Sequence, residues 1–402
     1  MGYRTLLRDH RSVLSIAFLA MFSSSLGQSF FVGLFQAPLA EHWQLSAGQF
    51  GTAYTVVTLA AGFVMLRVGP SIDWVAPRRF AITVLLALLA GVALMTLSPW
   101  WGLGVVGLGL VRLCGQGMLT HLGNTLAARE FTTLRGRAMG LASLGIPLGE
   151  ALLPPLVAVT LVWLSWQSFW WLLCALLALP WLWLLTQAPW STALGSKPAH
   201  RDPQGPRPFR EPRFWALLPL LMSLPITMTG LFIYQAQLTE ALDSSLGVYA
   251  LALAGMGVAK LPGALLGGRW IDKIGPARLA RVYLFPYASA MLFATLIGGD
   301  ASVWALMVGG GLAMGAQELI ASGLLIKLWG IEHLGRVRSA LSAAMVFSTG
   351  IAPAAIGLAL SAGMTFPAIL ATMLMFIVTA WCLAKRVLQV DSRTALAQDQ
   401  HR

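Results

Sequence analysis

Twelve apolar stretches, each long enough to cross a lipid bilayer, occupy most of this 402-residue chain. A helix rises about 1.5 Å per residue, so about 20 residues cross a hydrocarbon core of about 30 Å. Only 10% of the residues are charged, against roughly 25% in a soluble domain. We therefore predict an all-α integral membrane protein. The predicted transmembrane helices cover residues 13–38, 46–68, 80–98, 101–127, 138–163, 166–187, 214–239, 246–269, 280–298, 302–327, 338–362 and 365–384.

The basic residues are distributed unevenly around these spans. Of the 27 Lys and Arg, 25 lie outside mid-span positions, and all 25 fall on one side of the membrane when both termini are placed inside. The predicted outer loops carry Glu41, Glu240, Asp243 and Asp300 instead. This is the positive-inside bias, so we expect cytoplasmic termini and a multi-pass location in the inner (plasma) membrane. The bias also accounts for the net charge of +12, so no nucleic-acid partner is expected.

The chain repeats itself at a fixed offset of 199 residues. The string GPSIDWVAPRR at 69–79 matches GRWIDKIGPAR at 268–278. A stretch rich in Pro and charge separates six predicted spans from six, and an even number of spans makes the two halves parallel. We therefore predict two parallel six-helix bundles around a central cavity: an N-terminal bundle over 1–187, a cytoplasmic linker over 188–213 and a C-terminal bundle over 214–402.

The repeated loop resembles a motif of the major facilitator superfamily. That family carries Gly-x-x-x-Asp-(basic)-x-Gly-x-(basic)-(basic) between its second and third spans. The first copy departs from this pattern, because Trp74 replaces the first basic residue and Ala76 replaces the second glycine. The matching residues are Gly69, Asp73, Arg78 and Arg79 in the first copy, and Gly268, Asp272, Lys273, Gly275 and Arg278 in the copy between spans 8 and 9.

The resemblance covers essentially the whole chain and implies a gating role for the duplicated loop. Its acidic residues would pair with Arg129 and Lys327 at the ends of spans 4 and 10 and hold the two halves together on the inner side. The alternative is that these charges only set topology. Span 4 also carries GLVRLCGQG, which resembles the family's Arg-and-glycine motif at Arg112, Gly115 and Gly117.

Four ionisable side chains lie near mid-span positions: Arg112 in span 4, Glu150 in span 5, Lys260 in span 8 and Glu318 in span 10. A charge in mid-membrane costs at least about 2.5–3.5 kcal/mol, so each is expected to face protein or a wet cavity. One interpretation is two structural ion pairs, Arg112 with Glu150 and Lys260 with Glu318. The other is that the two cations bind an anionic substrate, while the carboxylates carry a coupling proton.

Three uncharged polar side chains are further candidates. His121, in the inner part of span 4, is a candidate proton relay, although a lone His is more often a packed polar residue. Gln36 and Gln235 are repeat equivalents near the outer ends of spans 1 and 7. They are expected either to bind substrate at the cavity mouth or to form hydrogen bonds between helices.

Together these features predict a secondary active transporter that works by alternating access on a small organic anion, such as a monocarboxylate, and protons. A cation in span 8 resembles the monocarboxylate and oxalate/formate branches of the superfamily. An exporter of amphiphilic compounds or drugs is the alternative on the same fold. A membrane receptor or membrane-embedded enzyme is the alternative of another class, but every loop is too short for a receptor domain and no GxxxxGK[ST] string is present.

Cofactor chemistry is not expected. The three cysteines, Cys114, Cys174 and Cys382, fall in apolar runs without metal-ligand spacing, so we predict no metal site, no cofactor and no catalytic residue. The expected partners are the small-molecule substrate, protons and the lipid bilayer, with a monomer as the functional unit.

Overall fold

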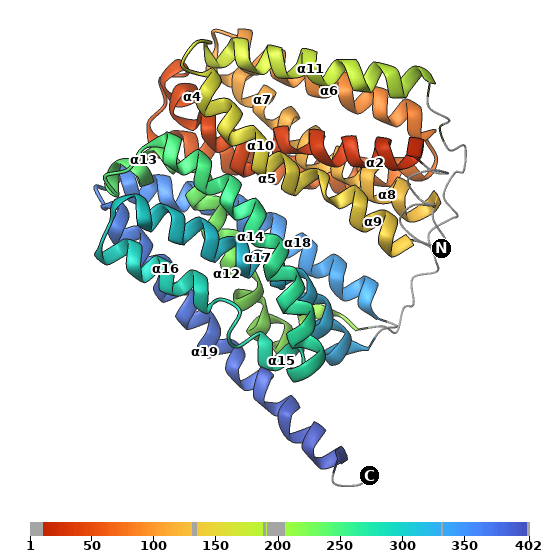
Figure 1. Cartoon of the computed structure of the whole chain (residues 1–402), viewed down its shortest axis with the longest axis vertical. Coiled ribbons are helices and arrows are strands. Elements are labelled where there is room, and N and C mark those ends of the chain that lie inside the picture. Colours follow the sequence, from red (N-terminus) through yellow and green to blue (C-terminus); the bar gives the residue numbers. More distant parts are fainter. Residues whose placement is uncertain (1–10, 131–134, 188–189, 191–205, 331–332, 400–402) are drawn as a thin grey trace. The chain divides into compact units, whose positions relative to one another are not determined.

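The computed structural model describes residues 11–130, 135–187, 190, 206–330 and 333–399. Within these ranges the regular secondary structure is helical, without a strand. The chain divides into two compact units, residues 1–201 and 202–402 (Figure 1). The boundary falls inside the predicted linker 188–213, most of which lies outside the described residues, so the linker stays a prediction.

Both units consist of long helices with short breaks (Figure 1). Unit 1 contains α2 (Arg11–Ser23), η1 (Ser24–Gly27), α3 (Ser29–Val32), η2 (Gly33–Phe35), α4 (Gln36–His42), α5 (Ala47–Val68), η3 (Gly69–Asp73), α6 (Pro77–Leu97), α7 (Trp101–Arg112), η4 (Leu113–Leu119), α8 (Thr120–Glu130), α9 (Arg135–Ser143), α10 (Gly145–Thr160) and α11 (Trp166–Gln187). Unit 2 contains η5 (Pro208–Arg210), α12 (Pro212–Ile233), α13 (Gln235–Ala241), α14 (Leu246–Ile274), α15 (Pro276–Leu279), α16 (Phe285–Leu296), α17 (Gly299–Trp329), α18 (Leu334–Ser361) and α19 (Phe366–Asp399).

Each of the twelve predicted ranges contains a helix, but two of them differ from a simple span. Ten helices of the described residues are long and apolar enough to cross a membrane, or eleven if the bent pair Arg11–Gly27 and Ser29–His42 counts as one. That pair meets at 44° and occupies the predicted first span. The predicted ninth span contains α16, whose 12 residues fall short of the roughly 20 that cross hydrocarbon. Pro286 accounts for its late start, because proline is favoured in a first helical turn and disfavoured further in.

The two units pack their second, third and fourth spans in the same way, whereas their first spans differ in part. In unit 1, α7 packs against α5 and α6, and α2 packs against α8, α9 and α10. In unit 2, α17 packs against α14 and α16, and α12 packs against α18 and α19. An aromatic cluster fills part of the core of unit 1, with the Phe31 and Trp170 ring centroids 5.1 Å apart. The repeat therefore places the fourth span of each half between its second and third.

The repeat also extends to the backbone. The short helices α4 and α13 begin and end at equivalent positions. Gln44 and Asp243 lie 199 residues apart and both have positive φ, 54° and 51°. Directly after them, Ser46 and Ser245 cap α5 and α14, because each side chain accepts the N–H three residues later, at 3.3 and 3.2 Å. The loops between the first and second spans are thus built from the same local signals.

The duplicated loop with its Asp residues has a different backbone in each half. In the second copy, α14 is continuous to Ile274, and Gly275 ends it at φ 79°, a conformation that glycine adopts without a Cβ penalty. In the first copy, α5 ends earlier and η3 follows. Ala76 then precedes α6 with φ −54°. A glycine is therefore required at position 275 but not at position 76, which explains why the first copy departs from the motif.

Candidate functional site

The first span is interrupted near its middle. Its helix α2 ends at Ser23, and η1 runs to Gly27. Gln28 is extended, with φ −77° and ψ 149°. A break of this kind leaves backbone carbonyl groups without the donors that a continuous helix supplies. Such groups need side-chain partners when they lie inside the protein.

Arg112, the last residue of α7, supplies a partner for this break. Its Nη1 donates to the Gly27 carbonyl at 2.8 Å and lies 3.2 Å from the Ser29 hydroxyl oxygen. Its guanidinium carbon lies 4.6 Å from the centroid of the Tyr54 ring, and the Tyr54 hydroxyl donates to Ser29 Oγ at 2.9 Å. The side chain is only 3% exposed. Arg112 therefore ties the fourth span to the first and second.

A π-helix, η4, directly follows Arg112 and covers the LCGQG segment. It brings the fourth span close to the break in the first. A Cβ atom on Gly115 would lie 2.5 Å from the Gly27 nitrogen, and a Cβ on Gly27 would lie 2.5 Å from the Val111 oxygen. Only glycine permits this approach of two backbones. The glycines of the motif thus place Arg112 within reach of the Gly27 carbonyl.

We expect Gly115→Ala to destabilise the protein by about 1–3 kcal/mol, the usual cost of overpacking a tight contact. A lower melting temperature of the purified variant in detergent would report this. Gly117→Ala in the same π-helix is the matched control, because its Cβ would lie 3.4 Å from Met65 Sδ, an ordinary contact. Equal melting temperatures for the two variants would contradict the expectation.

Glu150 lies on α10, which packs against the same break in the first span that Arg112 contacts. It is 4% exposed on α10, beside Gly149, whose Cα lies close to the Ser25 side chain. The contacts that the structure gives Arg112 come from Gly27, Ser29 and Tyr54. The ion pair between Arg112 and Glu150 that the sequence suggested stays a prediction. A role for Glu150 in proton coupling stays a prediction.

A second polar cluster lies in unit 2, among α12, α17 and α18. Glu318 of α17 and Arg338 of α18 form an ion pair, with 3.3 Å between Oε2 and Nη2. Their side chains are 71% and 54% exposed. Together with Gln317, Ser322 and Ser342 they line a cavity of about 80 Å³. This cluster combines a cation, a carboxylate and hydroxyl groups at one accessible place.

Gln317 has a separate, structural role beside this ion pair. Pro225 inside α12 lacks an N–H, so the Leu221 carbonyl four residues earlier loses its helical donor. Gln317 Nε2 donates to that carbonyl at 2.8 Å. The buried amide thereby joins α17 to α12 and satisfies a backbone group that proline left without a partner.

Lys260 is half-buried on α14, at a place where α17 packs closely against this helix. A Cβ atom on Gly315 would clash with the Lys260 carbonyl oxygen. The Glu318 carboxylate pairs with Arg338, so the ion pair seen for Glu318 is not the one with Lys260 that the sequence suggested. Arg338 was missed from the sequence because it begins the predicted eleventh span and was counted among the cytoplasmic charges.

The remaining candidates lie apart from these clusters. Gln36 and Gln235 are 2% and 1% exposed and begin α4 and α13, so each is buried inside its own unit. His121 is half-buried on α8. Their proposed roles stay predictions.

The gating motif is described only in part. The side chains of Asp73 and Arg129 lie outside the described residues, so the predicted latch stays a prediction. The described residues of the motif lie at the ends of α5, α14 and α17, at the start of α6 and in α15, and the charged ones among them are exposed. These residues are Gly69, Arg78, Arg79, Gly268, Asp272, Lys273, Gly275, Arg278 and Lys327.

Comparison with known proteins gives two kinds of match. A family model described as Major Facilitator Superfamily matches residues 17–236, more than half of the chain. No curated protein matches the sequence. Similar solved structures are crystal structures of a bacterial homolog of the human lysosomal transporter Spinster. Its inward-facing, occupied conformation is 16% identical, with 97% of both chains covered and a TM-score of 0.66. Its inward-facing, unoccupied conformation is 14% identical, with 96% of this chain and 98% of that chain covered and a TM-score of 0.67.

Proposed function

Because this chain belongs to the major facilitator superfamily and has the fold of a membrane transporter, we propose that it carries a small organic anion together with protons by alternating access. The observation that carries this proposal is the accessible ion pair between Glu318 and Arg338. Both ends of that pair have a role in such a cycle, one for the substrate and one for the proton.

The ion pair is suited to exchange because it is weak. An exposed pair contributes only about 0.2–1 kcal/mol, so a competing group replaces either partner at little cost. A substrate carboxylate offers Arg338 the same kind of charge-assisted hydrogen bond that Glu318 offers. The hydroxyl groups of Ser322 and Ser342 line the same cavity and supply further donors.

Exchange at this pair couples the anion to a proton. When Glu318 takes up a proton it loses its charge, and Arg338 becomes available to the substrate carboxylate. When the substrate leaves, Glu318 releases its proton and pairs with Arg338 again. One proton and one carboxylate thus occupy the site together, which is the stoichiometry of a symporter. We further propose that Lys260, the mid-span cation of α14 in the same unit, supplies a second positive charge for the anion.

The first step of a test is to find a substrate. A thermal-shift screen of the purified protein against organic acids, sugars and amphiphilic drugs at several pH values would identify compounds that bind the folded state. Stabilisation by small acids, increasing at lower pH, is the expected result. Stabilisation by amphiphilic cations alone would favour the exporter instead.

We expect Glu318→Gln to lose accumulation of the identified acid in proteoliposomes with an imposed pH gradient, while exchange of substrate across the membrane persists. The amide mimics the protonated carboxyl group, so the site binds anion but releases no proton. Glu240→Gln is the matched control, because Glu240 is an exposed carboxylate at the end of α13 in the same unit. Accumulation by Glu318→Gln at the wild-type rate would overturn the proposed coupling.

A further inference from the structure

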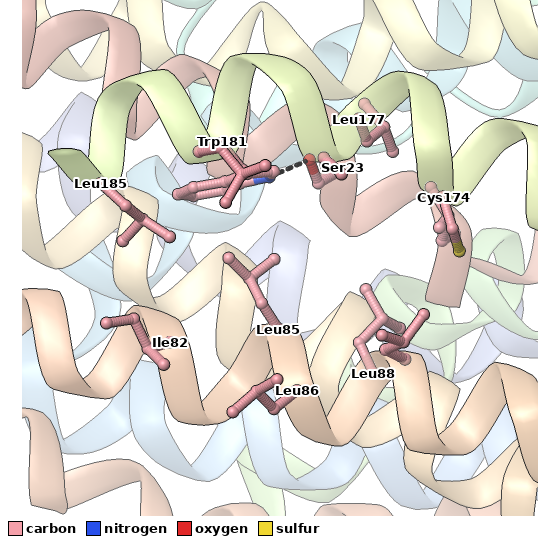
Figure 2. Close-up of a pocket in the computed structure, with 13 residues that line it drawn as sticks. Ser23, Ile82, Leu85, Leu86, Leu88, Cys174, Leu177, Trp181 and Leu185 are labelled. Atoms are coloured by element: carbon pink, nitrogen blue, oxygen red, sulfur yellow. Dashed lines mark hydrogen bonds between the residues drawn. The ribbon is translucent and has the colours of Figure 1, made fainter. Parts of the chain in front are cut away.

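An apolar groove lies in unit 1 between α6, α11 and the end of α2. Its volume is about 460 Å³, within the roughly 300–1,000 Å³ typical of small-molecule sites. In Figure 2, Leu85 of α6 lies across the groove from Trp181 of α11. The Trp181 indole N–H donates to the Ser23 hydroxyl at 3.0 Å, so the polar groups at this wall are paired with each other. The groove therefore presents a hydrocarbon surface.

The groove is open at the surface of unit 1, on a side that we expect to face lipid because its walls are apolar helices of membrane-spanning length. Its lining residues Leu86, Leu89 and Leu182 are 62%, 41% and 59% exposed. Both walls belong to helices long and apolar enough to cross a membrane, and the two helices lie side by side in Figure 1. Water gains no hydrogen bonds from such a lining, and the surrounding solvent at this depth is hydrocarbon. The occupant is therefore apolar and comes from the bilayer.

The length of the groove indicates which part of a lipid fills it. Along α11 the lining runs from Cys174 to Leu185, and eleven residues of helix rise about 16 Å. This is about half of the 30 Å hydrocarbon core, the depth of one leaflet. We propose that this groove binds one acyl chain of a membrane phospholipid.

A bound chain would act on the break in the first span. Ser23 is the last residue of α2 and directly precedes η1, and through Trp181 it ties α11 to this point. An acyl chain packed on Trp181 holds α11 against α2 beside the segment that Arg112 contacts. The groove is thus a lipid site that supports unit 1, and it is independent of the proposed anion site in unit 2.

The test uses photochemical labelling in lipid nanodiscs. A phosphatidylcholine with a diazirine in the middle of one acyl chain is irradiated with the full-length protein, and labelled peptides are mapped by mass spectrometry. We expect labelling of 82–89 and 174–185 to exceed severalfold that of α16, a helix with exposed apolar residues in unit 2. Ala178→Trp fills the groove and should remove this excess. Leu179→Trp, at a neighbouring residue that is 68% exposed and outside the lining, should retain it.

Melting temperatures of both tryptophan variants in detergent verify that they fold. Labelling spread evenly over the exposed apolar helices would overturn the proposal. So would equal labelling of Ala178→Trp and Leu179→Trp. Disulfide formation between Cys174 residues of two copies, with exclusion of the photolipid, would assign the groove to self-association instead. Displacement of the photolipid by a transported amphiphile would assign it to substrate.

Discussion

Arg112→Ala protein is expected to unfold at a clearly lower temperature than the wild-type protein. The substitution leaves the buried Gly27 carbonyl without its donor and removes the cation over the Tyr54 ring. A hydrogen bond to a charged group is worth about 1.5–3 kcal/mol, and a desolvated cation–π contact about 2 kcal/mol. Part of this is offset because a buried charge is also removed. We expect a net loss on the order of 3 kcal/mol in the free energy of unfolding, measured by thermal or denaturant unfolding in detergent.

Two further variants separate a structural role of Arg112 from a role in binding substrate. Arg112→Lys keeps the charge but loses the planar guanidinium that lies over the Tyr54 ring while its Nη1 donates to Gly27, so an intermediate melting temperature is expected. Arg338→Ala should melt like the wild type, because that cation is exposed and its pair is weak. If Arg112→Ala also melts like the wild type and loses only transport, Arg112 belongs to the substrate site as the sequence first suggested.

Lys260→Ala is expected to abolish uptake of the true substrate, with normal expression and an unchanged melting temperature. Lys260 is a mid-span cation on α14, and a charge at that depth is retained only where a pathway or a partner requires it. Removing it removes positive charge that the anion needs. Initial rates of uptake into proteoliposomes, over a range of substrate concentrations, provide the measurement.

The controls for Lys260→Ala distinguish the effect of the positive charge from the effect of side-chain length. Lys260→Arg should retain measurable uptake because it keeps the charge, whereas Lys260→Met, of similar length without charge, should not. Arg269→Ala, an exposed cation further along the same helix, should transport normally. Unchanged kinetics in Lys260→Ala would remove the anion site from our proposal.

Local sequence signals predicted the helical scaffold well. Apolar run length located a helix in each predicted span, and the 199-residue repeat reappears in the caps at Ser46 and Ser245. These features depend on residues close in sequence, so a pattern can reveal them. The short length of α16 was not predicted. The prediction rested on the apolar character of residues 280–298, which is the same whether or not Pro286 delays the start of the helix.

The partners of the charged residues were not predictable in the same way. Arg112 contacts a backbone carbonyl, and a carbonyl freed by a helix break has no residue type that marks it. The extended residue at the break is Gln28, which is neither glycine nor proline, the two residues that most often mark the end of a helix. Arg338 was missed for a different reason. The positive-inside rule already explained a cation at this end of the predicted span, so nothing in the sequence suggested a further role for Arg338.

Gln317 and Glu318 occupy consecutive positions of α17, but they make contacts of different stability. Gln317 forms a buried hydrogen bond, whereas Glu318 forms an exposed ion pair. The hydrogen bond from the Gln317 side-chain amide to the Leu221 carbonyl is buried, so water does not compete for it. We therefore expect α12 and α17 to move together as one rigid body. The exposed carboxylate next to it can exchange its partner without disturbing that body. Under the proposed coupling, uptake of a proton would therefore change the contact between Glu318 and Arg338 while α12, α17 and α18 keep their packing, because the Tyr234 hydroxyl also donates to the Pro353 carbonyl of α18 at 2.8 Å.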